Sequence, residues 1–441
     1  MLEPRSGRLY ASAVARWQRS RHLRTVTWLL FFFLVISFLN QCRLRLAVSD
    51  AFHSPGWKNV GTSAGPVQDH DAFDITNQAA SMEAAGNSTL GFNKIVFINV
   101  KKRYDREDAM AIQAYLAGLD IEDYPAVTPD MIISAGMPPS HRINAFKSAG
   151  IRGCYRAHAN VWSEMVRKRS PPVLIMESDA AWDINLRPIM SDINKQFVKF
   201  LHKINSTSLP DPSYAGRFHS SSSSSSSSEN TKPSKPVYDR SDPWLSSHWD
   251  LFSFGQCREG HQDHDIKLEW PAVHPPAGKF SYYGTPLNKT RVLRKSGGII
   301  CLTAYAVSHQ GAAKLLLRHA LDLDNPVDVL MQRMVMSRDV VAYSVNPPVV
   351  AQWAYRDGIG MAERGSQSDV NIDQNGGYQD TPENATMNGW KEVQHTGTVW
   401  KARKGWYNDG LFENMALAVA WKNIMPQGAE LRRSMRNPPK K

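Results

Sequence analysis

The chain has 441 residues, of which 42% are hydrophobic and 21% charged, and its formal net charge is +11. The hydrophobic fraction supports a full core and excludes a wholly disordered chain, while the length admits one large domain with appendages. The positive charge would suit a nucleic-acid-binding protein, but many of the basic residues lie within residues 1–24 and 432–441, so nucleic acid is the minor interpretation.

An apolar run over residues 26–39 carries no charge between Arg24 and Arg43. It follows a basic flank, as expected of a membrane anchor whose short N-terminus stays in the cytoplasm. A cleaved signal peptide is the alternative, but the run is rich in Phe and Leu and no convincing cleavage site follows it directly. We therefore predict three segments before the folded domain: a cytoplasmic tail over 1–24, a transmembrane signal-anchor over 25–42 and a flexible stem over 43–91.

From residue 94 the sequence alternates between short apolar stretches and longer amphipathic ones, which is typical of an α/β fold. Strands are predicted over residues 94–100, 123–127, 173–176, 249–255 and 299–305. Helices are predicted over 105–118, 153–168, 186–202 and 310–320, with Asp105 and Ser308 as the first and last caps. The first strand, helix and second strand make a βαβ opening, so we expect an α/β domain.

Residues 206–242 interrupt this alternation. The segment is rich in Ser, Pro and Lys, includes an unbroken serine tract over 220–228, and can bury little apolar surface. We interpret it as a disordered insertion within one domain over 92–400, which is followed by a C-terminal extension over 401–441.

The apolar strand over 173–176 ends in two carboxylates, Glu177 and Asp179, with Ser178 between them. This spacing puts both carboxylates on one side of the backbone, at the carboxyl end of a strand, where open α/β sheets bind ligands. Two hard oxygen ligands there suit Mg²⁺ or Mn²⁺ holding a diphosphate. An isolated Glu-x-Asp is more often a solvated turn in which Asp179 caps the next element, so the neighbouring motifs must decide.

Two further blocks precede the acidic pair: KIVFINVKKRYDR over 94–106 and GCYRAHANVW over 153–162. Together the three blocks resemble glycosyltransferase family 25, the lipopolysaccharide and collagen galactosyltransferase-like family, and the chain looks like a membrane-anchored member of fungal type. The likeness extends with gaps from about residue 94 to about residue 371. Two positions depart from the family pattern: Ser178 stands in place of an acid, and Ala157 in place of a serine.

The resemblance implies a GT-A-like, Rossmann-type mixed sheet flanked by helices. The reaction that it implies is the inverting transfer of a hexose, galactose in particular, from a UDP-sugar to a glycan or glycoprotein. It also implies that Glu177 and Asp179 hold Mn²⁺ or Mg²⁺. The residues that it suggests for binding the nucleotide-sugar are Asn99, Arg103, Arg106, His158 and Asp369. Asp328 and Asp250 are the two candidates for catalytic contact with the sugars, and Asp328 is the first candidate for the general base.

Most of these residues also have a structural interpretation. Arg103 and Arg106 can form a solvated basic turn, Asp250 and Asp328 can act as caps, and His158 on an apolar helical face is more often a core residue than a ligand.

Two other functions remain for the whole chain. A membrane-anchored binding or scaffold protein that retained the fold and lost turnover would tolerate the serine between the two carboxylates. A glycoside hydrolase would need two carboxylates several ångströms apart on either side of a sugar, whereas Glu-x-Asp at one strand end suits a single metal better.

The compartment follows from the predicted anchor, which puts the catalytic domain in the lumen of the Golgi or the endoplasmic reticulum. Four sequons are compatible with this location, at Asn87, Asn205, Asn288 and Asn384. Lumenal conditions permit a disulfide, and Cys257 with Cys301 is the first pairing to test, because Cys154 lies in a predicted helix and Cys42 at the membrane edge.

Overall fold

The computed structural model describes residues 75–142, 149–210, 234–260, 266–359, 385–403 and 411–425. The predicted tail and anchor, most of the stem, the serine tract and Asp369 lie outside these residues. No helix in the described part of the chain combines the length and the hydropathy that a membrane span requires.

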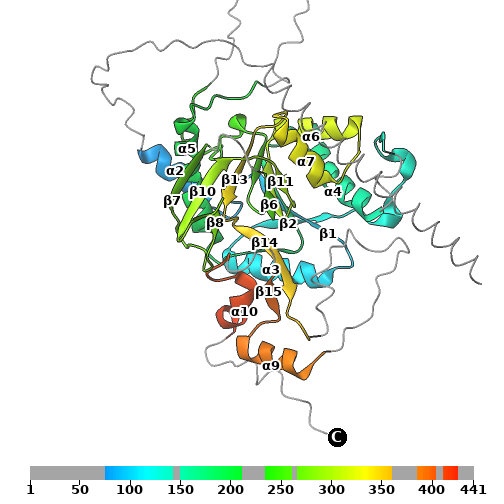
Figure 1. Ribbon diagram of the computed structural model, residues 1–441, viewed down its shortest axis with the longest axis vertical. Coiled ribbons are helices and arrows are strands. Elements are labelled where there is room, and N and C mark those ends of the chain that lie inside the picture. Colours follow the sequence, from blue (N-terminus) through cyan, green and yellow to red (C-terminus); the bar gives the residue numbers. More distant parts are fainter. Residues whose placement is uncertain are drawn as a thin grey trace, which may run out of the picture. The chain divides into compact units, whose positions relative to one another are not determined.

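An eight-stranded mixed sheet lies at the centre of the described unit, in the order β2-β1-β3-β12-β5-β13-β10-β7 (Figure 1). Its strands are β1 (Lys94–Asn99), β2 (Ile121–Pro125), β3 (Val173–Glu177), β5 (Leu251–Ser253), β7 (Lys267–Pro271), β10 (Thr290–Lys295), β12 (Ala304–Val307) and β13 (Ala342–Asn346). β2, β1 and β3 are mutually parallel, and β12 runs antiparallel to both β3 and β5. The predicted mixed sheet and its βαβ opening are therefore confirmed.

Helices cover both faces of this sheet, because alternate side chains of each strand point to opposite faces. On β3, Leu174 and Met176 belong to one core, whereas Val173 and Ile175 belong to the other. The first core is covered by α2 (Ile75–Ala85), α3 (Tyr104–Ala117) and α5 (Leu186–Lys203). The second is covered by α4 (Ala149–Lys168), α6 (His309–Leu321) and α7 (Val327–Met336), which gather on one side in Figure 1.

The order of the strands creates a crevice beside β1. The chain leaves β1 through α3 to reach β2 on one side, and leaves β2 through α4 to reach β3 on the other side. Because α3 and α4 cover opposite faces, their connections diverge at the carboxyl ends of β1 and β3, which is where such sheets bind ligands. The register pairs Ile98 with Glu177, so Asn99 and the acidic pair reach the same edge.

The ends of the helices follow the predicted capping chemistry in part. α6 begins after Ser308, whose hydroxyl accepts a hydrogen bond from the Gly311 amide as predicted. α3 ends at Gly118, also as predicted, where the left-handed backbone (φ 63°) suits glycine. Asp105 is not the cap of α3, because the helix begins at Tyr104 and Asp105 lies inside its first turn.

The segment 299–305 forms two strands instead of the single one that we predicted. β11 (Ile299–Ile300) pairs with β6 (Arg258–Glu259), whereas β12 joins the main sheet. Cys301, between them, has a φ of 66°, which extended backbone does not adopt. Asp328, which the sequence offered as a possible cap, lies in the first turn of α7, after Val327.

Residues 75–91 belong to the folded unit and not to a flexible stem. α2 packs on α5, where the Ser81 hydroxyl donates to Asn194 (3.2 Å), and the Trp244 indole donates to the buried Leu90 carbonyl (2.7 Å). The prediction was wrong here because α2 packs mainly small Ala and Ser residues, whose sequence shows little apolar periodicity.

The described flanks of the Ser-rich insertion are packed as well. Ser208 and Ser234 hydrogen-bond to each other, so the two flanks meet. The buried Tyr238 donates to the Lys195 carbonyl (3.3 Å), and Asp242 accepts two hydrogen bonds of 2.7 Å from Ser246. The disordered insertion predicted over 206–242 is therefore too long at both ends.

The C-terminal part of the chain returns to the centre of the fold. β14 (Val350–Tyr355) pairs with β4 (Ala180–Trp182) on one side and with β15 (Trp400–Ala402) on the other. The remaining elements are β8 (Ser281–Tyr282), β9 (Thr285–Pro286), α9 (Met387–Thr396) and α10 (Ala416–Ile424), and α10 packs on α3. The structure thus differs from the predicted domain end at residue 400, because β15 spans that position.

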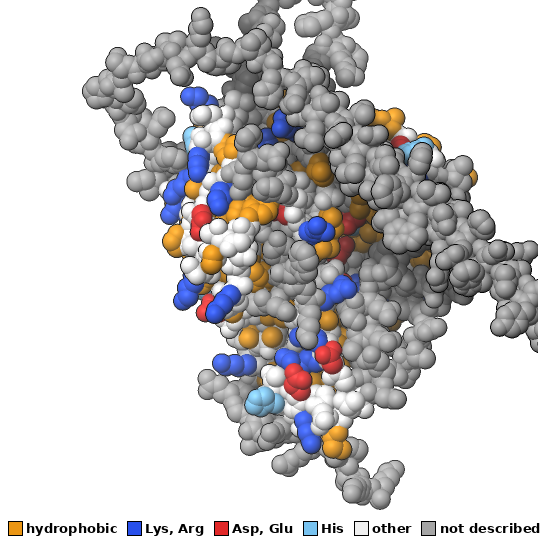
Figure 2. All heavy atoms as spheres, viewed as in Figure 1, with side chains coloured by type: hydrophobic (Ala, Val, Ile, Leu, Met, Phe, Trp, Pro, Cys, Tyr) orange, Lys and Arg blue, Asp and Glu red, His pale blue; other side chains and the backbone are white. Residues whose placement is uncertain are grey.

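The charge on the described surface is mixed. On the face in Figure 2, Lys and Arg side chains are interspersed with acidic, polar and hydrophobic ones over the residues that the structure describes.

Candidate active site

A cavity of ≈ 710 Å³ lies at the carboxyl ends of β1, β2 and β3. Its lining comes from the loop after β1, the loop after β2, one face of α4, the acidic turn after β3 and Gln352 of β14. A volume of this size is in the range of pockets that hold nucleotides and other small organic ligands.

Gly153 explains how α4 and the loop after β2 come together to form this cavity. A Cβ atom at this position would lie 2.2 Å from the Val127 carbonyl oxygen, so no larger residue fits without moving the loop. Gly153, which opens the block GCYRAHANVW (the GC block), therefore lets α4 pack closely against the loop after β2. Cys154, the next residue of the block, lies on the cavity lining.

The acidic pair is held rigidly at the end of β3. The Glu177 amide donates to the Thr303 carbonyl (3.0 Å), and the Trp353 amide donates to the Asp179 carbonyl (2.9 Å). The Arg106 guanidinium lies 3.2 Å from the Asp179 carboxylate and donates to the Ser178 hydroxyl (3.4 Å). Both carboxylates line the cavity, as the sequence predicted for the turn.

The electrostatics of this turn favour a bound cation. Burial, together with repulsion from the Asp179 and Asp328 carboxylates, raises the pKa of the Glu177 carboxyl to about 8, while Arg106 and the Gln352 amide oppose the rise. A positive charge between the carboxylates would relieve their repulsion.

Unpaired polar atoms point to the same conclusion. The Asp179 Oδ1 atom, on the cavity lining, is buried without a hydrogen-bond partner among the described residues. Both polar atoms of the Asn99 side chain are also buried without such a partner, but Asn99 is not among the residues that line the cavity. Hard oxygen donors with unused lone pairs are the ligands that Mg²⁺ and Mn²⁺ prefer, so this donor set fits a divalent cation.

The two predicted arginines have different surroundings. Arg106 lines the cavity, whereas Arg103 makes two hydrogen bonds to Asp105 (2.8 and 2.9 Å) and does not belong to the lining. Both side chains are buried, so the alternative of a solvated basic turn is wrong. Arg103 is placed to hold the start of α3, and its predicted contact with the nucleotide finds no support in this arrangement.

His158 combines a packed ring with a position on the cavity wall. Its Nδ1 atom is 2.9 Å from the Tyr305 hydroxyl, which also accepts a hydrogen bond from the Trp162 indole (3.0 Å). Burial lowers the pKa of His158 to about 3, with a smaller effect from His319, so the ring is neutral. His158 therefore packs as a core histidine through its Nδ1 atom, while the residue also forms part of the cavity wall.

Asp250 is not brought to the site. Val307 pairs with both Val173 and Leu251, so Asp250 lies just before the amino-terminal end of β3, roughly 16 Å along the strand from Glu177 at 3.3 Å per residue. Its buried carboxylate accepts from the Val341 amide (2.8 Å) and pairs with Lys314 (2.7 Å). Asp250 stabilises this end of the sheet and is not among the residues that line the cavity, so its predicted catalytic contact finds no support in this arrangement.

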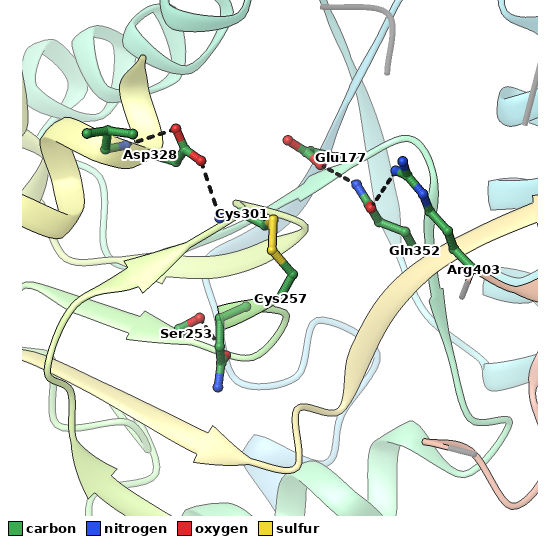
Figure 3. Close-up of a disulfide and its surroundings, with 9 residues drawn as sticks. Glu177, Ser253, Cys257, Cys301, Asp328, Gln352 and Arg403 are labelled. Carbon is green, nitrogen blue, oxygen red and sulfur yellow. Dashed lines mark hydrogen bonds between the residues drawn. A yellow bond between two sulfur atoms is a disulfide. The ribbon is translucent and has the colours of Figure 1, made fainter. Parts of the chain in front are cut away.

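Asp328, in contrast, lies near Glu177 and raises its pKa, although it is not among the residues that line the cavity (Figure 3). Its carboxylate accepts from the Val329 amide (2.9 Å) and the Cys301 amide (3.4 Å). Cys301 forms a disulfide with Cys257, which confirms the predicted pairing and anchors the loop facing Asp328.

Gln352 also reaches the acidic turn and is contacted by Arg403, and the sequence predicted neither of them as a site residue. The Gln352 amide contacts Glu177, and Arg403 contacts Gln352 (Figure 3). They come from distant strands and belong to no local motif, so only the pairing of β14 with β4 and β15 reveals them.

This chain is similar to known glycosyltransferases over part of its length. The family model described as glycosyltransferase family 25 (LPS biosynthesis protein) matches residues 92–331. A glycosyltransferase 25 family member of Drosophila melanogaster is 28% identical over 143 residues, which cover 30% of this chain and 22% of the relative. Procollagen galactosyltransferase 2 of Mus musculus is 27% identical over 121 residues, covering 24% of this chain and 19% of the relative. The matched part of the chain spans about a fifth of the length of these relatives.

Proposed function

This chain belongs to glycosyltransferase family 25, and we propose that it transfers a hexose, galactose in particular, from a UDP-sugar to a glycan or glycoprotein acceptor. One observation carries the proposal: the acidic pair of the family pattern lines a cavity of ≈ 710 Å³ at the carboxyl ends of three parallel strands. The relatives named procollagen galactosyltransferase 2 support galactose as the sugar and a protein-linked acceptor.

Glu177 and Asp179 are the residues proposed to hold Mn²⁺ or Mg²⁺, which would neutralise the diphosphate leaving group. Arg106, 3.2 Å from Asp179, is placed to make charge-assisted hydrogen bonds to phosphate oxygens. The GC block and the loop after β2 would enclose the nucleotide, since they form the cavity wall.

Asp328 is proposed as the general base of an inverting single displacement. Its carboxylate is fixed by two backbone amides and lies close enough to raise the pKa of Glu177. In this role it would accept the proton of the acceptor hydroxyl as that oxygen attacks the anomeric carbon and the bond to the leaving UDP breaks.

We place the catalytic domain in the lumen of the Golgi or the endoplasmic reticulum, attached by the apolar run over 26–39. The Cys257–Cys301 disulfide supports this, because such bonds persist in oxidising compartments. The three sequons within the described residues, at Asn87, Asn205 and Asn288, are exposed and accessible to glycosylation.

A membrane-anchored binding protein without turnover is the second candidate. It is favoured by Ser178 in place of an acid and by the Arg106–Asp179 ion pair, which neutralises one of the two carboxylates.

The decisive experiment measures UDP release by the full chain, purified in detergent, from a panel of nucleotide sugars in Mn²⁺, Mg²⁺ or EDTA. We expect metal-dependent hydrolysis of UDP-galactose above that of the other donors. Glu177→Gln should weaken metal-dependent UDP binding, whereas Asp328→Asn should retain that binding and lower kcat about a hundredfold or more. UDP binding without release from any donor would favour the second candidate.

A further inference from the structure

β14 joins the acidic turn to a part of the chain that lies beyond the matched residues 92–331. Gln352 of β14 pairs with Ala180, which directly follows the turn, and the next amide, of Trp353, donates to the Asp179 carbonyl (2.9 Å). The backbone of β14 therefore fixes the position of the turn. Its side chains can then act on the carboxylates at short range.

Gln352 connects Glu177 to Arg403 through its side-chain amide (Figure 3). Its Nε2 atom lies 3.4 Å from Glu177 Oε2, and its Oε1 atom lies 2.9 Å from Arg403 Nη1. The Arg403 backbone amide also donates to the Gln352 carbonyl (2.8 Å). Arg403 is thus held to Gln352 at both its backbone and its side chain.

The chemistry of arginine determines which way the amide faces. A guanidinium has hydrogen-bond donors only, so it requires the carbonyl oxygen of the Gln352 side chain. The amide nitrogen is then turned toward Glu177, where it can donate to a carboxylate oxygen. In this orientation Oε2 of Glu177 is engaged, and Oε1 makes no hydrogen bond to the described residues.

We propose that Gln352 and Arg403 are positioning residues for the acidic site: Arg403 orients the Gln352 amide, and that amide holds the Glu177 carboxylate in the pose that receives a divalent cation with its nucleotide. The inference rests on the proposed function, because the ligand in question is UDP with a divalent cation. Residues that orient metal ligands are commonly worth 10–100-fold in metal affinity, so the effect is measurable.

A purely structural role, in which the pair only joins β15 to β14, makes a different prediction. Loss of that junction would affect folding and metal-independent contacts alike. Positioning of Glu177 would affect only the binding that depends on the metal.

The test is calorimetry of UDP binding to the full chain, in Mn²⁺ and in EDTA, for Gln352→Met, Arg403→Met and the double variant. We expect Gln352→Met to weaken Mn²⁺-dependent UDP binding about 10–100-fold and to leave binding in EDTA unchanged. Arg403→Met should weaken it by a similar or smaller factor. Because Arg403 acts through Gln352, the double variant should bind as Gln352→Met does, instead of showing the product of both effects.

Lys401→Met is the matched control, since it removes a positive charge from β15 where Lys401 pairs with the exposed Asp357. Basic and acidic side chains lie next to one another over β15 and α9 in Figure 2. Lys401→Met should bind UDP as the wild type does. Three results would each overturn the inference. The first is wild-type UDP affinity in both Gln352→Met and Arg403→Met, and the second is a loss of affinity in Lys401→Met equal to theirs. The third is a double variant whose loss is the product of the two single losses.

The wild-type titration separates this inference from the function on which it rests. A wild-type chain that binds no UDP in Mn²⁺ contradicts the proposed function and the inference with it. Metal-dependent binding that survives in the variants overturns the inference alone. Should Gln352→Met fail to fold, Arg403→Met carries the test, because its half-buried side chain can be shortened without opening the core.

Discussion

Replacement of Glu177 by glutamine should stabilise the metal-free protein while it damages the site. The carboxyl has a pKa of about 8 in the folded chain, against 4.5 for an ordinary glutamate, because burial and the neighbouring Asp179 disfavour its charged form. A pKa raised by folding gives its full stabilisation below pH 4.5, and this is lost as the pH rises toward 8.

The size of the effect follows from proton linkage. Between the two pKa values the folded chain holds one more proton than the unfolded chain, so the free energy of unfolding falls by about 1.4 kcal/mol per pH unit. At pH 7 the folded chain still holds this proton, which the unfolded chain has released, and the difference costs about 3 kcal/mol of unfolding free energy; Glu177→Gln should recover most of it. At pH 5 the gain should shrink to below about 1 kcal/mol.

Urea unfolding followed by tryptophan fluorescence, in EDTA at several pH values, measures this difference. Mn²⁺ and UDP at about a hundred times their dissociation constant should stabilise the wild type by about 2.7 kcal/mol and the variant far less. The stability advantage of Glu177→Gln over the wild type should therefore shrink or reverse when the ligands are added. Glu164→Gln is the control with the opposite sign. The hydrogen bond from Lys168 lowers the pKa of Glu164, and losing this pair on the surface should cost up to about 1 kcal/mol.

The reasoning would be refuted by a Glu177→Gln chain that is less stable than wild type at pH 7 in EDTA. A stability difference that stays constant between pH 5 and pH 7 would refute it equally, because the gain must then come from packing and not from the charge.

Three further outcomes are expected. Deleting 211–233 across a short Gly/Ser bridge should leave the thermal midpoint unchanged in scanning fluorimetry. Deleting 206–242 should lower the midpoint by several degrees, because it removes the buried Tyr238. Equal midpoints for the two deletions would show that the flanks contribute nothing to stability. Asp250→Asn should cost about 2–3 kcal/mol of unfolding free energy, because it breaks the ion pair of the buried Asp250 with Lys314. UDP affinity in Mn²⁺ should not change. Lost affinity in a folded variant would show that Asp250 acts on the binding site. Burial lowers the pKa of His319 to about 4, so the stability that its neutral ring contributes is present above pH 6.5 and is lost as the pH falls. His319→Gln should therefore reduce the slope of unfolding free energy against pH between pH 6.5 and 5 by about 1.4 kcal/mol per unit. Equal slopes in variant and wild type would contradict this.

The chemistry of the site was readable from short stretches of sequence. An apolar run that ends in Glu177 and Asp179 predicted a buried strand with two carboxylates at its carboxyl end, and the structure has both. Ser308 as a cap and Gly118 as a helix end follow from the same kind of information. These features depend on contacts between residues a few positions apart, so spacing and residue type are sufficient.

The sheet decided which distant residues join that turn. Asp250 has the residue type and the neighbours of a site residue, yet the register of β12 with β3 and β5 carries it to the opposite edge. Gln352 and Arg403 show no motif, yet the pairing of β14 with β4 and β15 brings them to Glu177. Strand order and register depend on packing over the whole core, so a short stretch of sequence does not specify which strands become neighbours or which residues pair. The sequence by itself therefore determined the family, the helices and strands around the acidic pair and the residue types available for chemistry, while only the tertiary structure decided which carboxylates share a cavity and which side chains orient them.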